Sequence, residues 1–284
     1  MLRRAPGNGA PESSLDPVAI VALVLLGTVT GFLAGLLGIG GGMIIVPFMA
    51  IVLDRLGFEH DLVLKLAIAT SLTTILFTSM SSVRAHHRRG AVRWDILRTL
   101  APGIVLGSMA AAQVVRFMPS RWIALFFGAF IAWTAVNMLR RRPRASADAP
   151  ARGLPGNAGM FGAGGAIGAL SAFLGAGGGF LTVPFLSGRQ VRIHEAVATS
   201  AACGFPIALA GTIGYIIAGI GLEMPAHTIG FVYLPGLAAV ASASVLTAPL
   251  GARAAHALPV DTMRRLFACI LFGLSAYMFW RGLR

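Results

Sequence analysis

The feature that most constrains this fold is an apolar segment broken by glycines, which the chain contains twice. Residues 31–48 read GFLAGLLGIGGGMIIVPF and residues 168–185 read GALSAFLGAGGGFLTVPF, 137 positions apart. Glycines interrupt helices, and backbone groups freed inside a membrane must find partners within the protein or along a cavity. Two interruptions at matching places are typical of a transporter whose broken helices meet near the middle of the bilayer.

The composition indicates a membrane protein. The chain has 284 residues, of which 56% are hydrophobic and 12% are charged, whereas a soluble domain carries about 25% charged residues. Several of its apolar stretches approach the ~20 residues that a helix needs to cross the hydrocarbon core. These stretches are 18–37, 43–53, 66–83, 99–115, 122–139, 158–174, 180–187, 196–220, 228–250 and 266–280. We therefore predict an all-α polytopic membrane protein with about 8–10 membrane segments.

Other classes of protein find little support. The first apolar run is too long for a signal peptide, and no cleavage pattern follows it, so we expect it to remain as a membrane element. Cys203 and Cys269 lie in apolar segments and indicate neither a disulfide nor a metal site. The net charge of +13 fits basic flanks of membrane segments rather than nucleic-acid binding. We predict no cofactor and no nucleic-acid partner; the lipid bilayer is a partner, and homo-oligomerisation is left open.

The two halves match beyond the glycine break. Ala69-Thr70-Ser71 recurs as Ala198-Thr199-Ser200, and we pair Ala101-Pro102-Gly103 with Leu234-Pro235-Gly236. A basic, proline-containing stretch separates the halves and reads as a linker. The predicted organisation is a disordered tail over 1–16, a first membrane repeat over 17–140, a basic cytoplasmic linker over 141–157 and a second membrane repeat over 158–284.

The lengths of the segments predict that the repeats are inverted. Met43 to Leu53 would span ~17 Å as a helix, about half of the hydrocarbon thickness. Each helix, break and half-helix should therefore form a re-entrant-like hairpin, and the three helices that follow it give each half an odd number of crossings. With the loops 84–98, 187–195 and 251–265 on the linker's side, that side carries fifteen Lys and Arg residues and the other carries eight. This bias favours a cytoplasmic linker with both termini outside.

The glycine clusters are the predicted substrate site. Glycine allows positive φ and close approach to its backbone, and each half-helix points its N–H groups and positive dipole end at the break, which suits an anion. A purely packing role is the alternative, and we expect that role for Gly103 and Gly107. The repetition, with a proline at the same offset, favours binding. The predicted binding glycines are Gly38, Gly40, Gly41, Gly42, Gly175, Gly177, Gly178 and Gly179.

Polar side chains near the breaks extend this prediction. Thr70, Ser71, Thr199 and Ser200 could donate hydrogen bonds to an anion, or could bond to carbonyls one helical turn earlier. Lys65 and His194 each lie five residues before the repeated threonine, and Glu195 follows His194. These three could lie on the anion's path or carry a proton. The simpler interpretation is that they flank the membrane as interfacial residues.

The repeated motif resembles the sulfite exporter TauE/SafE family of membrane permeases. The resemblance rests on Gly38-Ile39-Gly40-Gly41-Gly42 with Val46-Pro47-Phe48, on Gly175-Ala176-Gly177-Gly178-Gly179 with Val183-Pro184-Phe185, and on the Ala-Thr-Ser segments. It spans about Val18 to Trp280. The family usually has Gly-Thr-Ser in place of Ala-Thr-Ser. The resemblance implies transport of sulfite, sulfonates or related small organosulfur anions, without choosing among them.

The sequence therefore predicts a secondary transporter that works by alternating access of two inverted repeats. A passive anion channel of the same fold, or a permease for a non-sulfur anion such as a carboxylate, remains open. An enzyme is not predicted, because the apolar segments contain no paired carboxylates, no His/Cys cluster and no nucleophile with a base.

Overall fold

The computed structural model describes residues 17–37, 42–88, 90–140, 153–255 and 260–284, which form ten α-helices and one two-stranded hairpin. The first half contains α1 (Pro17–Leu37), α2 (Gly42–Arg55), α3 (His60–Arg88), α4 (Trp94–Phe117) and α5 (Ser120–Arg140). The second contains α6 (Asn157–Phe173), α7 (Gly179–Ser187), α8 (Ile193–Gly219), β1 (Thr228–Ile229), β2 (Val232–Tyr233), α9 (Leu234–Ala255) and α10 (Val260–Leu283). The protein is an all-α polytopic membrane protein, as predicted.

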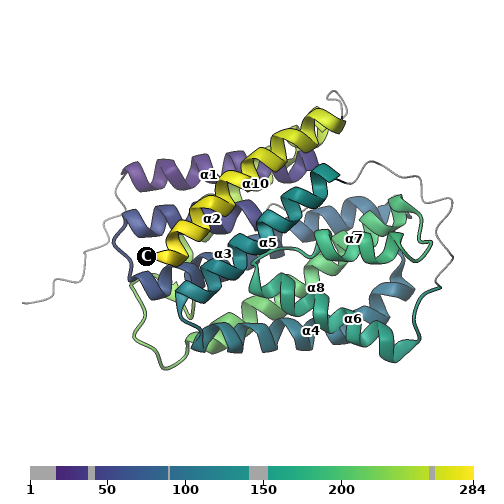
Figure 1. The fold of residues 1–284 in the computed structure, drawn as a ribbon, viewed down its shortest axis with the longest axis horizontal. Helices are drawn as coiled ribbons and strands as arrows, with labels where there is room; N and C mark the ends of the chain where they lie inside the picture. The colour runs from purple at the N-terminus through teal and green to yellow at the C-terminus, as the bar shows by residue number, and fades with distance from the viewer. Residues whose placement is uncertain (1–16, 38–41, 89, 141–152, 256–259) are drawn as a thin grey trace, which may run out of the picture.

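Helix length and burial separate the central helices from the outer ones. Helices α3, α4, α5 and α8 are long and apolar enough to span a membrane. In the most apolar 18 residues of each helix, 78% are buried in α3 and 61% in α8, but only 33% in α5. Helices α3 and α8 therefore form the centre of the bundle, and α5 presents most of its surface outward, beside α10 (Figure 1).

The two halves exchange contacts in a reciprocal way. Helix α1 of the first half packs on α9 of the second, and α6 of the second packs on α4 of the first. A Cβ built on Gly27 would meet Val240, and one built on Gly164 would meet Leu100. Since Gly164 occupies the place of Gly27 in the duplicated sequence, the two interfaces correspond position by position. The contact of α1 with α9 therefore has a counterpart in the contact of α6 with α4.

This correspondence corrects one pairing. Leu100 of α4 matches Val240 of α9, whereas Ala101-Pro102-Gly103 was paired with Leu234-Pro235-Gly236. Pro102 lies inside α4. Pro235 is the second residue of α9, where a backbone N–H has no partner within the helix, so a proline there removes no hydrogen bond. The paired prolines are thus unrelated. The packing role predicted for Gly103 and Gly107 is confirmed, because a Cβ on either would lie 2.1 Å from a carbonyl oxygen of α6.

A short antiparallel hairpin precedes α9, where only an apolar stretch was predicted. Thr228 pairs with Tyr233 and Ile229 with Val232. Phe231, Val232 and Tyr233 are buried, so this hairpin reaches into the bundle. It sets the start of α9 at Leu234, close to the central helix α3.

Candidate functional site

The start of α2 lies against the second glycine break. Gly42 is the first residue of α2, and a Cβ built on it would lie 2.3 Å from the carbonyl oxygen of Gly175. That same oxygen accepts a hydrogen bond of 2.8 Å from Ser71 Oγ of α3. The predicted residues Gly38, Gly40 and Gly41 lie outside the described residues. The contact nevertheless brings the start of the first half-helix to the second break.

The second break has the backbone geometry that its glycines allow. Gly175 and Gly178 have φ of +59° and +76°, a region that favours glycine. Gly178 is the N-cap of α7. Among the hydrogen bonds of the described residues, none is donated by the N–H groups of residues 177–180. The unpaired amides and the helix dipole give this buried break a partial positive charge.

Three buried hydroxyls belong to α6, which ends just before this break, to α7, which begins at it, and to α8, which packs against α7. Ser171 Oγ near the end of α6, Thr182 Oγ1 in α7 and Ser200 Oγ in α8 have no hydrogen-bond partner in the described part of the chain. A Cβ built on Gly178 would lie 3.1 Å from Ser171 Oγ, so this hydroxyl faces the start of α7. Buried hydroxyls are normally paired, so these three exceptions, of which Ser171 faces the unpaired amides, are free to donate to a ligand with several acceptor oxygens.

Of these three hydroxyls, the sequence analysis singled out Ser200 and did not single out Ser171 and Thr182. The signal was present as a difference between the two copies. Ser171 stands where the first copy has Ala34, and Thr182 stands where it has Ile45. A comparison of the two copies draws attention to the residues that they share. Ser171 and Thr182 are instead positions at which the second copy is more polar than the first.

The predicted residues Thr70 and Thr199 make equivalent framework contacts. Thr70 Oγ1 of α3 accepts a hydrogen bond of 3.0 Å from the backbone N–H of Tyr233, just before α9. Thr199 Oγ1 of α8 accepts one of 3.0 Å from the N–H of Arg93, just before α4. Each central helix therefore holds the start of an outer helix from the other half. In this conformation neither hydroxyl is unpaired.

Lys65 and His194 occupy different environments although their sequence positions match. Lys65 is buried, and its ammonium donates a hydrogen bond of 3.0 Å to the carbonyl of Arg116 in the last turn of α4. A cation there complements the negative end of the helix dipole. His194 is exposed at the start of α8. Neither side chain is placed at the glycine breaks by a contact among the described residues.

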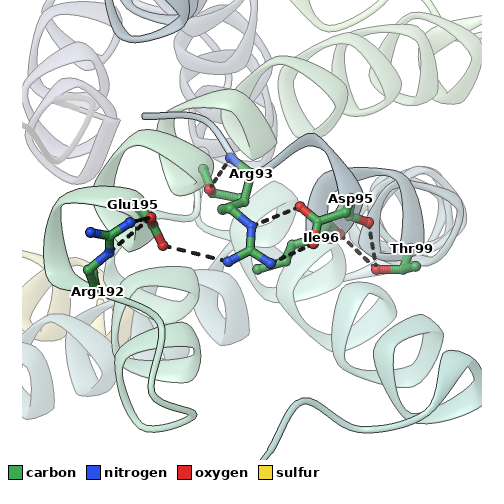
Figure 2. A network of polar contacts seen from close by, with 7 residues as sticks. Arg93, Asp95, Ile96, Thr99, Arg192 and Glu195 are labelled. Carbon is green, nitrogen blue, oxygen red and sulfur yellow. Dashed lines mark hydrogen bonds and ion pairs between the residues drawn. The ribbon is translucent and has the colours of Figure 1, made fainter. Parts of the chain in front are cut away.

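Glu195 belongs to an ionic network that joins the two halves. Figure 2 shows Arg93 between Asp95 and Glu195, with Arg192 on the far side of Glu195. Arg93 Nη2 lies 2.7 Å from Asp95 Oδ2, and Arg93 Nη1 lies 3.6 Å from Glu195 Oε2. Arg192 Nε donates to Glu195 Oε1 at 3.1 Å. The hydrogen bond to Asp95 raises the pKa of the Arg93 guanidinium above its ordinary value, so this arginine is always charged.

Comparisons with known proteins agree with this architecture. The family described as sulfite exporter TauE/SafE matches residues 23–278. A probable membrane transporter protein of Haemophilus influenzae is 33% identical over 261 residues, which cover 92% of this chain and 98% of that protein. A probable membrane transporter protein of Methanocaldococcus jannaschii is 25% identical over 258 residues, covering 90% and 94% of the two chains. No solved structure matches the chain.

The family match extends from α1 to α10 and includes both glycine breaks. Together with ten helices in two corresponding halves, it establishes a multi-pass membrane transporter. The chain belongs to the sulfite exporter TauE/SafE family.

Proposed function

We propose that this transporter carries a small sulfur oxyanion, such as sulfite or a sulfonate, by alternating access of two inverted repeats. The observation that carries the proposal is the set of unpaired groups at the second break and on the helices next to it: the amides of residues 177–180 and the hydroxyls of Ser171, Thr182 and Ser200. All of these groups can donate to an anion's oxygens, and none carries a formal charge. A sulfonate or sulfite group presents three oxygens to such donors.

A neutral site suits transport of this class of anion. An arginine buried at the break would bind the anion strongly and slow its release, whereas amides and hydroxyls supply partial charge alone. The contact between Gly42 and Gly175 also supports a site at the interface of the two halves. Relative movement of the halves would then open the same donors first to one side of the cell membrane and then to the other.

Flux measurements in proteoliposomes test this proposal. Purified protein should show saturable uptake of a radiolabelled sulfonate, and unlabelled sulfonate inside the vesicles should accelerate it by counterflow. A carboxylate of the same size should compete weakly. Linear flux without counterflow would indicate a channel. Preference for the carboxylate would contradict the proposal that the substrate is a sulfur oxyanion.

Two glycine variants connect the flux to the break. A leucine at Gly178 would adopt a positive φ and collide with Ile207, 2.5 Å from the new Cβ. We expect Gly178→Leu to insert into the membrane and to lose sulfonate flux. Gly162→Leu is the matched control, because Gly162 in α6 has open space around its Cβ position. Normal flux in the Gly178 variant would disprove the assignment of the site.

A further inference from the structure

A cavity lined by charged and aromatic side chains lies at the C-terminal end of α2, whereas the N-terminal end of α2 contacts the second glycine break. It has a volume of about 440 Å³ and is formed where α2 and α10 end and α3 begins. Its lining includes Asp54, Arg55, His60, Trp280, Arg281 and Arg284. Three guanidinium groups therefore surround one carboxylate, and nothing in the transport proposal uses them.

The single carboxylate is already engaged. Asp54 forms a salt bridge with Arg281, whose side chain is 3% exposed, and accepts a hydrogen bond of 3.2 Å from the hydroxyl of Tyr277. Arg281 Nη2 also donates to the carbonyl of His60 at 3.2 Å. This arrangement fixes the floor of the cavity and neutralises Asp54. Arg281 is therefore a structural residue rather than a free cation.

The other two arginines are available to an anion. In the described part of the chain, neither Arg55 nor Arg284 forms a salt bridge. The guanidinium of Arg284 lies 4.0 Å from the centre of the Trp280 ring, which orients it by a cation–π contact. The cavity thus has two unneutralised guanidinium groups at its mouth, beside a tryptophan that is 51% exposed.

An exposed apolar stripe leads along α10 to this mouth. Phe272, Ala276, Trp280 and Leu283 are exposed and are spaced three or four residues apart, which places them on one face of the helix. Helix α10 runs along the outside of the bundle and ends at the marked C-terminus (Figure 1). A stripe of this kind faces lipid chains, and Trp and Arg at its end are typical of the headgroup region. The occupant should therefore have both an anionic head and acyl chains.

We propose that the cavity between α2 and α10 binds the phosphate of an anionic phospholipid, whose chains lie along the α10 stripe. Arg55 and Arg284 would contact the phosphate, and Trp280 would lie at the level of the glycerol. Basic pockets between membrane helices favour such headgroups. The proposal does not depend on which anion the protein transports.

Lipid titrations of the detergent-purified protein test this site. Dioleoyl phosphatidylglycerol should raise the melting temperature and should bind as a resolved adduct in native mass spectrometry. The phosphatidylcholine with the same chains should bind more weakly, and sodium phosphate should give no comparable shift. Arg55→Gln with Arg284→Gln should weaken phosphatidylglycerol binding by about 25-fold, since each arginine near a headgroup contributes about fivefold.

Arg121→Gln is the matched control. Arg121 is exposed at the same end of the bundle, where its backbone approaches Gly282, but it does not line the cavity. This variant should bind phosphatidylglycerol as the wild type does. Equal binding of phosphatidylcholine, an equal shift with sodium phosphate, or an equal loss in the Arg121 variant would each overturn the proposal.

Discussion

A hydroxyl that is buried without a partner costs the folded protein free energy, because it has lost its hydrogen bond to water. Ser171 and Thr182 are such residues, and in the first copy of the repeat Ala34 and Ile45 stand in their places. An apolar residue is therefore compatible with this fold at both positions. Their polarity is better explained by what they bind than by what they stabilise.

This reasoning predicts opposite effects on binding and on stability. In Ser171→Ala and Thr182→Val, the half-saturation concentration for sulfonate uptake should rise about fivefold each, because each change removes about 1 kcal/mol of hydrogen bonding to the anion. The melting temperature of the substrate-free protein should be unchanged or higher. Uptake kinetics and thermal denaturation of the same preparations would measure both effects.

Ser275→Ala supplies the control for that pair. Ser275 Oγ in α10 donates a hydrogen bond of 2.8 Å to the carbonyl of Gly128 in α5, away from the breaks. Its removal should lower the melting temperature and leave the half-saturation concentration unchanged. If Thr182→Val behaved like Ser275→Ala, the hydroxyl of Thr182 would be structural.

At the scale of the helices, the starts of α4 and α9 are held by the same kind of hydrogen bond. Each has a backbone N–H just before its first residue that donates to a threonine of a central helix in the other half. The hairpin before α9 and the loop before α4 are otherwise unlike in sequence. The threonine is therefore the shared element of this contact between the two halves, which explains why it stands in both Ala-Thr-Ser segments.

Thr70→Ala and Thr199→Ala should both destabilise the protein. Each leaves an N–H without its acceptor, buried at Tyr233 and part-buried at Arg93, at a cost of about 1–3 kcal/mol, and each kcal/mol lowers the melting temperature of a chain of this size by about 2–4 °C. Thr70→Ser and Thr199→Ser keep the acceptor and should melt near the wild type. A raised half-saturation concentration with no loss of stability in the alanine variants would instead assign these hydroxyls to the substrate.

At the scale of the helices, the sequence predicted the starts of the half-helices well and the contacts between helices poorly. Apolar runs and glycines determine where a membrane helix starts and stops, so the half-helices beginning near Met43 and Phe180 were found within one residue. Pairing Pro102 with Pro235 was wrong, because a proline motif carries no information about its position in a helix. Ser171 and Thr182 were missed because their role depends on which helices meet, and this is a property of packing.

For the whole molecule, side-chain contacts sort the loops into two ends. Asp61 binds Ser120, and Asp54 binds Arg281, so the α2–α3 loop, the α4–α5 loop and the C-terminus share one end. Arg93 and Glu195 join the α3–α4 and α7–α8 loops at the other. The count of Lys and Arg residues in the sequence analysis assigned these same loops to the same two sides. The ionic contact between Arg93 and Glu195 therefore joins the two halves at that end.

Weakening the contact between Arg93 and Glu195 should give solvent and reagents more access to the residues below it. Below it, Val92 packs with Ala198 and Ala202, and the next residue of α8, Cys203, is buried. In a Cys269→Ser background, Glu195→Gln should increase the rate of Cys203 labelling by N-ethylmaleimide up to about fivefold, as expected for loss of a partly exposed ion pair. Asp95→Asn should have no such effect, because Asp95 pairs with Arg93 inside the first half. Equal rates in the two variants would exclude a closing role for Glu195.

The charge distribution also predicts which end faces the cytoplasm. Since basic residues concentrate in the loops at the Arg93 end, that end should be cytoplasmic and the Asp54 end should face outside. Cysteines placed at the exposed positions Glu59 and Arg88, in a background without Cys203 and Cys269, report on the two ends. A membrane-impermeant maleimide added to intact cells should label Glu59→Cys and should label Arg88→Cys only after permeabilisation. The reverse pattern would mean that the Asp54 end is cytoplasmic and that the Arg93–Glu195 contact lies on the outer side of the membrane.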